Sequence, residues 1–510
     1  MKKILGRALI VIPAVALQIF WYLVIFGLLS GLLNRQLVAA INALFSVLAV
    51  VFVVTLAAKR DESSYKLLWA IIIVAMPVLG AMLYLLLGNK KTGRKLKKSL
   101  EQSARTLSGT LKADSLAEFA AVKAEDLRLG QSLSRVAEAT GFPLYKNAET
   151  NYYPFGEDMF RDMCEDLKRA EKYIYVEYFI IQPGKFWDSL TDIMAQKAAE
   201  GLDVRVMYDD LGSIGSYSLS NIIELSKKGI RCIPFNPFLF IKTQLNNRDH
   251  RKIMVIDGNV AYSGGINLAD EYINEKQRFG RWKDIGFRIK GEAVKSYLYM
   301  FTQFWNAFSN DKIPVSLLTS AQEQQAQGEN GYILPYYDSP VSSEHTSNEF
   351  FTELLSVATD YVWFYTPYLI LGDALMDAFI RAAKRGVDVR IIMPGIPDKK
   401  MIYRISRSYY KELIKAGVRI FEYEPGFVHA KAVLADDKIA GIGTVNLDYR
   451  SLFLHFECNS IFYKADIVDE LKRDFLSTQE LCAERKAGDT DRGPLYELVN
   501  RFLRLIAPLL

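Results

Sequence analysis

The chain of 510 residues contains few of the residues that build metal sites and covalent cross-links. It has only four histidines and four cysteines, the latter being Cys164, Cys232, Cys458 and Cys482. The cysteines are scattered and show no Cys-x-x-Cys spacing, so the sequence indicates neither a zinc site nor a disulfide framework. A reduced, cytoplasm-facing catalytic region is the simplest interpretation.

The chain also lacks a strong charge of either sign. Its net charge of +5 is a mild excess, which favours an anionic surface without choosing between lipid and nucleic acid. Hydrophobic residues make up 50% of the chain. That share is high for a purely soluble enzyme and indicates a membrane-embedded portion.

Three apolar runs open the chain, at residues 8–33, 37–58 and 67–88. Each is near or above the roughly 20 residues that a helix needs to cross a bilayer. We therefore predict that residues 1–88 form a multi-pass membrane anchor of two to three hydrophobic segments. The third run contains Pro77 and Gly80, so it could be re-entrant or kinked.

Basic residues favour a cytoplasmic catalytic region but do not fix the topology. The densest cluster, at residues 90–98, follows the third run, and such clusters favour the cytoplasmic side. A second cluster, at residues 59–66, favours the same side although a full crossing separates the two. Either one of the two basic clusters lies on the extracytoplasmic side, or one of the apolar runs does not cross the bilayer.

A pattern of the form His-x-Lys-x-x-x-x-Asp occurs twice in the rest of the chain. Its members are His250, Lys252 and Asp257 in the first copy and His429, Lys431 and Asp436 in the second. On a strand, His and Lys two residues apart point to the same face. An imidazole beside a fixed ammonium suits chemistry on a phosphate, because the Lys neutralises the phosphoryl oxygens while the His attacks or gives up a proton.

Each copy is followed by a glycine-containing turn that ends in asparagine. The turns are Gly264-Gly265-Ile266-Asn267 and Gly443-Thr444-Val445-Asn446. Such turns let backbone N–H groups and the amides of Asn267 and Asn446 approach the same anion. Ser263 and Thr444 flank these turns and could also touch phosphate. A single pattern could consist of ordinary strand residues, but two copies with matching turns argue against that interpretation.

The surrounding sequence repeats as well. Residues 169–178 match 358–367 in pattern, and 201–206 match 386–391, so the order helix, strand, helix, Gly, strand recurs. Each half is predicted to be an α/β unit with a largely buried sheet. Because neither half holds both histidines, the active site is expected at their interface. The predicted organisation after the anchor is a linker with an amphipathic helix (89–140), a first half (141–324), a second half (325–490) and a C-terminal amphipathic helix (491–510).

The doubled pattern resembles the signature of the phospholipase D superfamily, which has two pseudo-repeated α/β/α halves. In that family one histidine forms a phospho-histidine intermediate and the other protonates the leaving group, with no metal or other cofactor. The resemblance implies that Asp284 and Glu457, on strands after the two motifs, orient the histidines. Asp448, Arg450 and Ser451 continue the second motif as the superfamily often does. Asp257 and Asp436 complete the catalytic motifs, although a structural role near the turn is favoured for both.

The third apolar run, with Trp69, Pro77, Gly80, Tyr84 and Gly88, resembles the N-terminal segment of bacterial cardiolipin synthases. This implies transfer of a phosphatidyl group from one phosphatidylglycerol to another, with release of glycerol and a phosphatidyl-histidine intermediate on His250. The expected partners are phosphatidylglycerol and the bacterial cell membrane, with no nucleic acid. Homo-oligomerisation stays open.

Other functions also fit parts of the sequence. A hydrolytic phospholipase D, or another phosphatidyltransferase such as one that makes phosphatidylserine, would use the same motifs. A membrane-tethered nuclease would need extended basic and aromatic surfaces, and the run at residues 404–411 is better explained as a solvated helix face. A non-enzymatic scaffold is disfavoured because both motifs are intact.

Overall fold

A computed structural model describes residues 19, 23, 35–59, 62–88, 93–111, 115–146, 148–237, 246–320, 331–342, 344–490 and 493–507. The first predicted apolar run, at residues 8–33, falls almost entirely outside these residues. The chain divides into two compact units. Unit 1 comprises Met1–Lys91, Phe238–Asn246 and Pro494–Leu510, and unit 2 comprises Thr92–Pro237 and Asn247–Gly493.

Unit 1 contains a small group of helices. They are α2 (Arg35–Ala57), α3 (Ser63–Ala75), α4 (Pro77–Leu83), the π-helical turn η1 (Tyr84–Gly88) and α18 (Pro494–Ile506). The last of these contacts α3. None of the helices that the structure describes is both long enough and apolar enough to span a bilayer.

The third apolar run is broken at Met76, between α3 and α4. Met76 has φ −138° and ψ 75°, because a residue before proline is disfavoured in the helical region. Pro77 then begins α4, a position where its missing N–H removes no hydrogen bond. Gly80 lets α4 approach α3 closely, since a Cβ there would lie 2.4 Å from the carbonyl oxygen of Ile72. The kink that the sequence allowed is therefore present.

Unit 2 contains two sheets with the same strand order. The first has the order β2 (Glu149–Tyr153), β9 (Gly286–Lys290), β7 (Val260–Gly264), β6 (Lys252–Ile256), β3 (Tyr173–Tyr178), β4 (Asp203–Asp209), β5 (Arg231–Phe235). The second repeats it as β10 (Tyr332–Asp338), β17 (Glu457–Tyr463), β16 (Ile439–Gly443), β15 (Ala432–Ala435), β11 (Tyr361–Tyr365), β12 (Asp388–Pro394), β13 (Arg419–Tyr423). The predicted pair of repeated α/β halves is confirmed.

Two short edge strands extend the second sheet at its margins. They are β1 (Tyr145–Lys146) beside β10 and β18 (Cys482–Arg485) beside β13. The residues of β1 were expected in the first half, but they pair with the second sheet. In both sheets the central strands β3 and β11 are parallel to one neighbour and antiparallel to the other. Both strands are buried throughout, as their aromatic and β-branched composition predicts.

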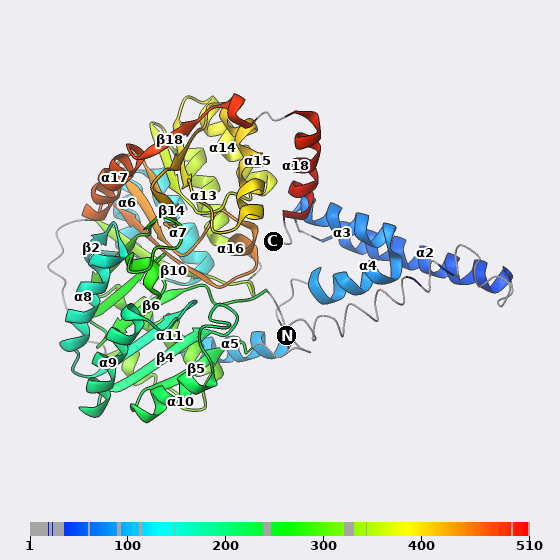
Figure 1. The fold of residues 1–510 in the computed structure, drawn as a ribbon. Coiled ribbons are helices and arrows are strands. Elements are labelled where there is room, and N and C mark those ends of the chain that lie inside the picture. Colours follow the sequence, from blue (N-terminus) through cyan, green and yellow to red (C-terminus); the bar gives the residue numbers. More distant parts are fainter. Residues whose placement is uncertain are drawn as a thin grey trace. The chain divides into compact units, whose positions relative to one another are not determined.

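Helices pack around the strands of each half (Figure 1). In the first half they are α8 (Gly156–Lys168), α9 (Lys185–Ala199), α10 (Leu219–Lys227) and α11 (Val294–Phe308). In the second they are α13 (Thr346–Val357), α14 (Asp373–Lys384), α15 (Lys400–Ala416) and α17 (Asp466–Gln479). Gly201 and Gly386 follow α9 and α14 with φ of 98° and 91°, so they end these helices in the left-handed conformation that glycine tolerates.

The segment expected as a linker is part of unit 2. It forms α5 (Arg94–Thr106), α6 (Leu116–Glu125) and α7 (Leu127–Thr140). Helix α5 packs on α11, where the Ser103 hydroxyl donates to the Gln303 carbonyl at 2.8 Å. Helix α7 packs on α13 and β10 of the second half. These helices therefore belong to the catalytic body.

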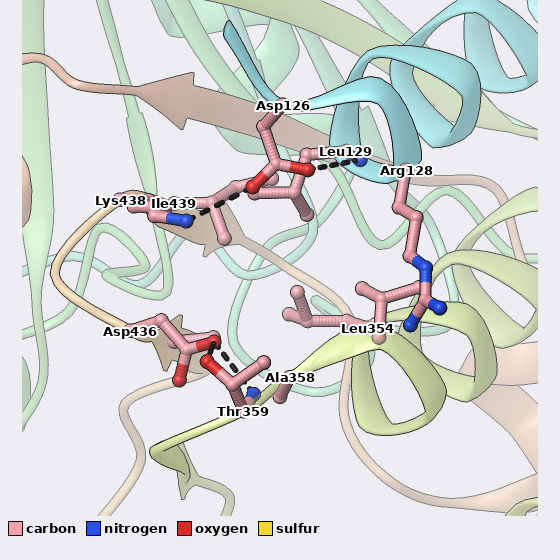
Figure 2. A pocket seen from close by; sticks show the side chains of 11 residues that line it. Asp126, Arg128, Leu129, Leu354, Ala358, Thr359, Asp436, Lys438 and Ile439 are labelled. Carbon is pink, nitrogen blue, oxygen red and sulfur yellow. Dashed lines mark hydrogen bonds and ion pairs between the residues drawn. The ribbon is translucent and has the colours of Figure 1, made fainter.

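Asp257 and Asp436 lie at the ends of β6 and β15 that are remote from the motif histidines. The Asp257 carboxylate accepts hydrogen bonds from the backbone N–H groups of residues 171–173, at 2.7–2.8 Å. The Asp436 carboxylate does the same for residues 359–361, and Figure 2 shows its bond to Thr359. Both aspartates have positive φ, 55° and 51°. These contacts support a structural role and place neither carboxylate at the reacting groups.

Replacing either aspartate should reduce stability more than catalysis. Asp436→Asn and Asp257→Asn each leave backbone donors without a charged acceptor, and we expect each to lower the free energy of unfolding by about 1–3 kcal/mol. Denaturant unfolding and the turnover rate per folded molecule would be measured on the same samples. A large loss of turnover without loss of stability would contradict the structural assignment.

Candidate active site

Each motif histidine is held by an acid from the other half of unit 2. His250 Nδ1 lies 2.8 Å from Oε2 of Glu457, and His429 Nδ1 lies 2.6 Å from Oδ2 of Asp284. Both acids are completely buried. The structure thus places both expected acids beside an imidazole, and it adds that the pairing crosses between the halves. We call these pairs the His250–Glu457 dyad and the His429–Asp284 dyad.

Backbone pairing between short strands of the two halves creates this crossed arrangement. Strand β8 (Arg281–Lys283) of the first half pairs in parallel with β14 (Gly426–Val428) of the second. His429 N–H then donates to the Lys283 carbonyl at 2.7 Å, next to Asp284. In the same way, His250 N–H donates to the carbonyl of Phe456 at 2.9 Å, next to Glu457. Backbone bonds between the halves therefore set the position of both dyads.

The two motif lysines are buried beside the dyads. Lys252 Nζ donates to the carbonyl of His250 at 2.6 Å, and Lys431 Nζ donates to the carbonyl of His429. Burial lowers the pKa of Lys252 to about 8, with Glu457 acting in the opposite direction. Burial also lowers the pKa of Lys431 to about 7, with Asp284 acting in the opposite direction. An anion that enters the site would favour the charged form of both.

Burial keeps both imidazoles neutral near pH 7. It lowers the pKa of His429 to about 4, with a further decrease from Lys431 and an opposing effect from Asp284. The pKa of His250 is well below its usual value because of burial, and then because of Lys252, Lys431 and His429. Groups from both halves therefore act on one another within a single site. A neutral imidazole can attack phosphorus or accept a proton.

The turn residues have different partners in the two halves. Asn267 is engaged at both ends, since its Oδ1 accepts from Ile180 N–H at 3.1 Å and its Nδ2 donates to the Tyr272 hydroxyl at 2.8 Å. Asn446 is also buried, but its Oδ1 has no hydrogen-bond partner among the described residues. Of the two asparagines, Asn446 is therefore better placed to change partners when a substrate binds.

Ser263 and Thr444 support other groups of the site. The Ser263 hydroxyl donates to the carbonyl of Lys252 at 2.8 Å. The Thr444 hydroxyl donates to Oε2 of Glu457 at 2.5 Å, and its oxygen accepts from Cys458 N–H at 2.9 Å. Ser263 therefore holds the backbone of the strand that carries Lys252, and Thr444 holds Glu457, the acid that faces His250.

Aromatic side chains surround His429, and the sequence interpretation missed them. The ring centroid of His429 lies 5.3 Å from that of Tyr272, 5.6 Å from that of Trp282 and 6.0 Å from that of Phe427. A sequence signal did exist for two of them, because Trp282 and Phe427 precede Asp284 and His429 by two residues and so share their face of a strand. Beside His250 the corresponding contact is Phe179, at 4.8 Å.

Buried ion pairs hold the strands that carry the dyads. Arg251 is completely buried and binds Asp249 at 3.0 Å and also Glu177. The pair of Lys283 and Asp474 joins the two halves at 2.6 Å. Glu177 and Asp474 lie 74 and 191 residues from their partners, so no local pattern could reveal these two pairs. In the parts of the chain that the structure describes, no cluster of three or more His, Cys, Asp or Glu side chains is arranged to hold a metal ion.

Comparison with known families gives two matches along the chain. The family described as "Cardiolipin synthase, PLD-like domain" matches residues 163–305 and 351–478, one segment in each half. The family described as "Phospholipase_D-nuclease N-terminal" matches residues 44–89. The first match covers both dyads, and the second covers the region of α2 to η1.

Individual relatives agree with these matches. An uncharacterized protein of Streptococcus mutans is 41% identical and covers 87% of this chain and 96% of its own length. Cardiolipin synthase 2 of Bacillus cereus is 34% identical over 89% of this chain and 88% of its own, and a cardiolipin synthase of Geobacillus kaustophilus is 33% identical over 96% and 98%. The crystal structure of Haemophilus influenzae phosphatidylserine synthase shares the fold, with a TM-score of 0.56 at 14% identity over 74% of this chain and 100% of that one. The chain therefore belongs to the cardiolipin synthase family of phospholipase D-like proteins.

Proposed function

We propose that this protein is a phosphatidyltransferase that makes cardiolipin and glycerol from two molecules of phosphatidylglycerol. The observation that carries the proposal is the crossed pair of His–acid dyads with a buried lysine beside each one. Two neutral imidazoles and two buried ammonium groups suit attack on a phosphodiester. Cardiolipin synthases that are 31–34% identical over most of the chain support cardiolipin as the product.

The reaction proceeds in two steps with one covalent intermediate. In the first, Nε2 of one histidine forms a bond to the phosphorus of a phosphatidylglycerol, and the bond from phosphorus to the headgroup glycerol oxygen breaks. The other histidine takes up a proton when the phosphate anion binds, because that negative charge raises its pKa, and it gives this proton to the glycerol oxygen as glycerol leaves. In the second step the same histidine takes a proton from a hydroxyl of a second phosphatidylglycerol. This oxygen attacks phosphorus, the P–N bond breaks, and cardiolipin forms.

The lysines and Asn446 bind the phosphate in both steps. Lys252 and Lys431 are buried and lie on opposite halves, so they would hold the two non-bridging oxygens from opposite sides. Charge then builds up on these oxygens in a site without bulk water, where fixed cations stabilise it strongly. The Ser263 hydroxyl of the first half lies 3.5 Å from the Cys458 sulfur of the second half, so the halves are in contact beside Lys252.

Residues 1–88 anchor the enzyme to the bacterial membrane, with the catalytic halves on the cytoplasmic side. Large apolar side chains of unit 1 are exposed, among them Val47 and Val54 on α2 and Val74 on α3, at 60%, 61% and 65%. Exposed aliphatic side chains in such numbers are typical of a surface that meets lipid. The kink at Met76 agrees with a third segment that enters the bilayer without a straight crossing.

The proposed function predicts a defined set of products. The full-length protein in phosphatidylglycerol vesicles, with a chelator present, should form cardiolipin and glycerol, identified by mass spectrometry. His250→Ala and His429→Ala should each reduce this by at least about 100-fold, because each removes one partner of the proton and phosphoryl transfer. His345→Ala is the matched control and should retain activity, since His345 takes no part in either dyad.

The product pattern separates the candidate functions. Phosphatidic acid as the sole product would identify a hydrolase. Absence of any lipid product from the unaltered protein would contradict the proposed function.

The lowered lysine pKa values predict that anions bind together with protons. At pH 8 Lys431 is largely neutral and Lys252 about half so, because their pKa values are about 7 and about 8. A bound anion raises both values, so sulfate binding should take up protons at pH 8 and fewer at pH 6, where both lysines are already charged. Calorimetry in two buffers of different ionisation enthalpy measures this uptake. Lys431→Met should reduce it, and uptake that does not change with pH would contradict the assignment.

A further inference from the structure

The C-terminal helix α18 carries an exposed stripe of large apolar side chains. Leu495, Leu498 and Phe502 are 74%, 63% and 61% exposed. They are three and four residues apart, so they lie along one face of the helix. Arg501 is also exposed and lies three residues after Leu498, on the same side. We call the three apolar residues the α18 stripe.

The sequence explains where this helix begins and why it cannot cross a bilayer. Pro494 occupies the first helical position, where its missing N–H removes no hydrogen bond. Glu497 in the first turn and Arg504 in the last turn match the helix dipole. The 13 residues of α18 span about 20 Å, whereas a hydrocarbon core is about 30 Å thick. A lipid contact of α18 therefore has to lie in the interface.

The α18 stripe is not used for packing within the protein. The helix packs on α3 of the same unit. Leu503, Leu505 and Ile506 are partly buried, and Asn500 is 8% exposed. The helix thus has apolar residues on both its packed and its exposed side. Helices that are apolar all round are normally buried, so the stripe calls for a second apolar neighbour.

The other helices of unit 1 indicate what this neighbour is. Helices α2 and α3 each carry three or more large apolar side chains that are exposed. On α3 these are Leu67, Ile71 and Val74, at 55%, 46% and 65%. Helix α18 contacts α3 and lies crosswise to it in Figure 1. The stripe therefore belongs to the same unit as the surface that the proposed function assigns to the membrane.

Arg501 favours a lipid surface over a second copy of this chain. Its guanidinium can reach lipid phosphates while its aliphatic stem lies along the apolar side chains. Anionic headgroups such as those of phosphatidylglycerol attract an arginine at this depth. An apolar protein surface laid over the stripe would instead enclose this charge without a partner, which is costly.

We propose that α18 is a second membrane-binding element, which lies in the bilayer interface with the α18 stripe among the acyl chains and Arg501 at the phosphates. This inference rests on the proposed function at a membrane and extends it to the C-terminal end of the chain. Unit 2 begins at Thr92, after the anchor, and ends at Gly493, directly before α18. Both ends of the catalytic unit are then joined to membrane-bound segments, which keeps it at the surface that holds its substrates.

A fluorescent label tests the location of the stripe without reference to activity. Full-length Leu498→Cys would be labelled with a nitrobenzoxadiazole maleimide and reconstituted into phosphatidylglycerol–phosphatidylcholine vesicles with brominated acyl chains. Its emission should shift to the blue and be quenched by the bromine. The matched control is Leu219→Cys, on α10 of unit 2 and 71% exposed, which should show neither change. The unaltered protein gives the background from the four native cysteines.

Two results of the labelling would overturn the proposal. One is a label at residue 498 whose emission matches that of the control, which would place the stripe in water. The other is a blue-shifted label that bromine does not quench, which would show that protein, such as a second copy of this chain, covers the stripe.

The effect on catalysis depends on how the substrate arrives. The triple variant Leu495→Ser/Leu498→Ser/Phe502→Ser should form cardiolipin from phosphatidylglycerol vesicles at least about tenfold more slowly, because three large apolar side chains no longer leave water. The same variant in phosphatidylcholine vesicles, supplied with dissolved dihexanoyl phosphatidylglycerol, should react within about twofold of the unaltered protein, since exposed substitutions rarely disturb a fold. An equal loss with both substrates, or no loss on vesicles, would overturn the proposal.

Exposed apolar residues of unit 2 provide the control for this comparison. Leu116→Ser/Leu219→Ser/Ile223→Ser removes side chains that are 76%, 71% and 49% exposed, and it should leave both rates unchanged. A tenfold loss on vesicles in this control as well would overturn the special role of α18. Failure of the proposed function would show separately, as absence of cardiolipin from the unaltered protein while the label at residue 498 is still quenched.

Discussion

The reciprocal hydrogen bonds between His250 and Glu457 and between His429 and Asp284 are the constraint on which the rest of the site depends. Neither half can orient its own imidazole, because each acid is supplied by the opposite half. The pairing of β8 with β14, and the hydrogen bond from His250 N–H to the Phe456 carbonyl, hold the halves in the register that this requires. Both halves of the repeat are therefore needed, because a single half would have a histidine without the acid that orients it.

Burial determines the chemistry of the groups once they are in place. The lysines and acids of the site, Lys252, Lys431, Asp284 and Glu457, lie away from bulk water. The cost of isolated charge there keeps the imidazoles neutral and lowers the pKa values of Lys252 and Lys431 to about 8 and about 7. A phosphodiester anion supplies the missing negative charge. Substrate binding and lysine protonation thus support each other, and the site is fully charged only when it is occupied.

The sequence predicted the parts of this site that recur along the chain. Duplicated His, Lys and Gly–Asn positions gave the two halves, and the alternation of strand residues placed each Lys on the side of its His. The sequence could not predict which acid serves which histidine, because the partners lie 207 and 145 residues apart and meet only through contacts between the halves. It also could not show the ion pair of Lys283 and Asp474. Asp257 and Asp436 satisfied the motif but bind backbone N–H groups, since a strand end needs an acceptor there. The kink at Met76 followed from Pro77 and was predictable from local geometry.

The claim that both dyads form within one chain has a direct test. The His250→Ala and His429→Ala variants would be reconstituted together in the same phosphatidylglycerol vesicles, and cardiolipin formation would be compared with that of each variant alone. Because each chain needs both of its own histidines, the mixture should remain as inactive as the single variants. Recovery of about a quarter of the activity of the unaltered protein, the share expected if halves from different chains combined freely, would contradict this account.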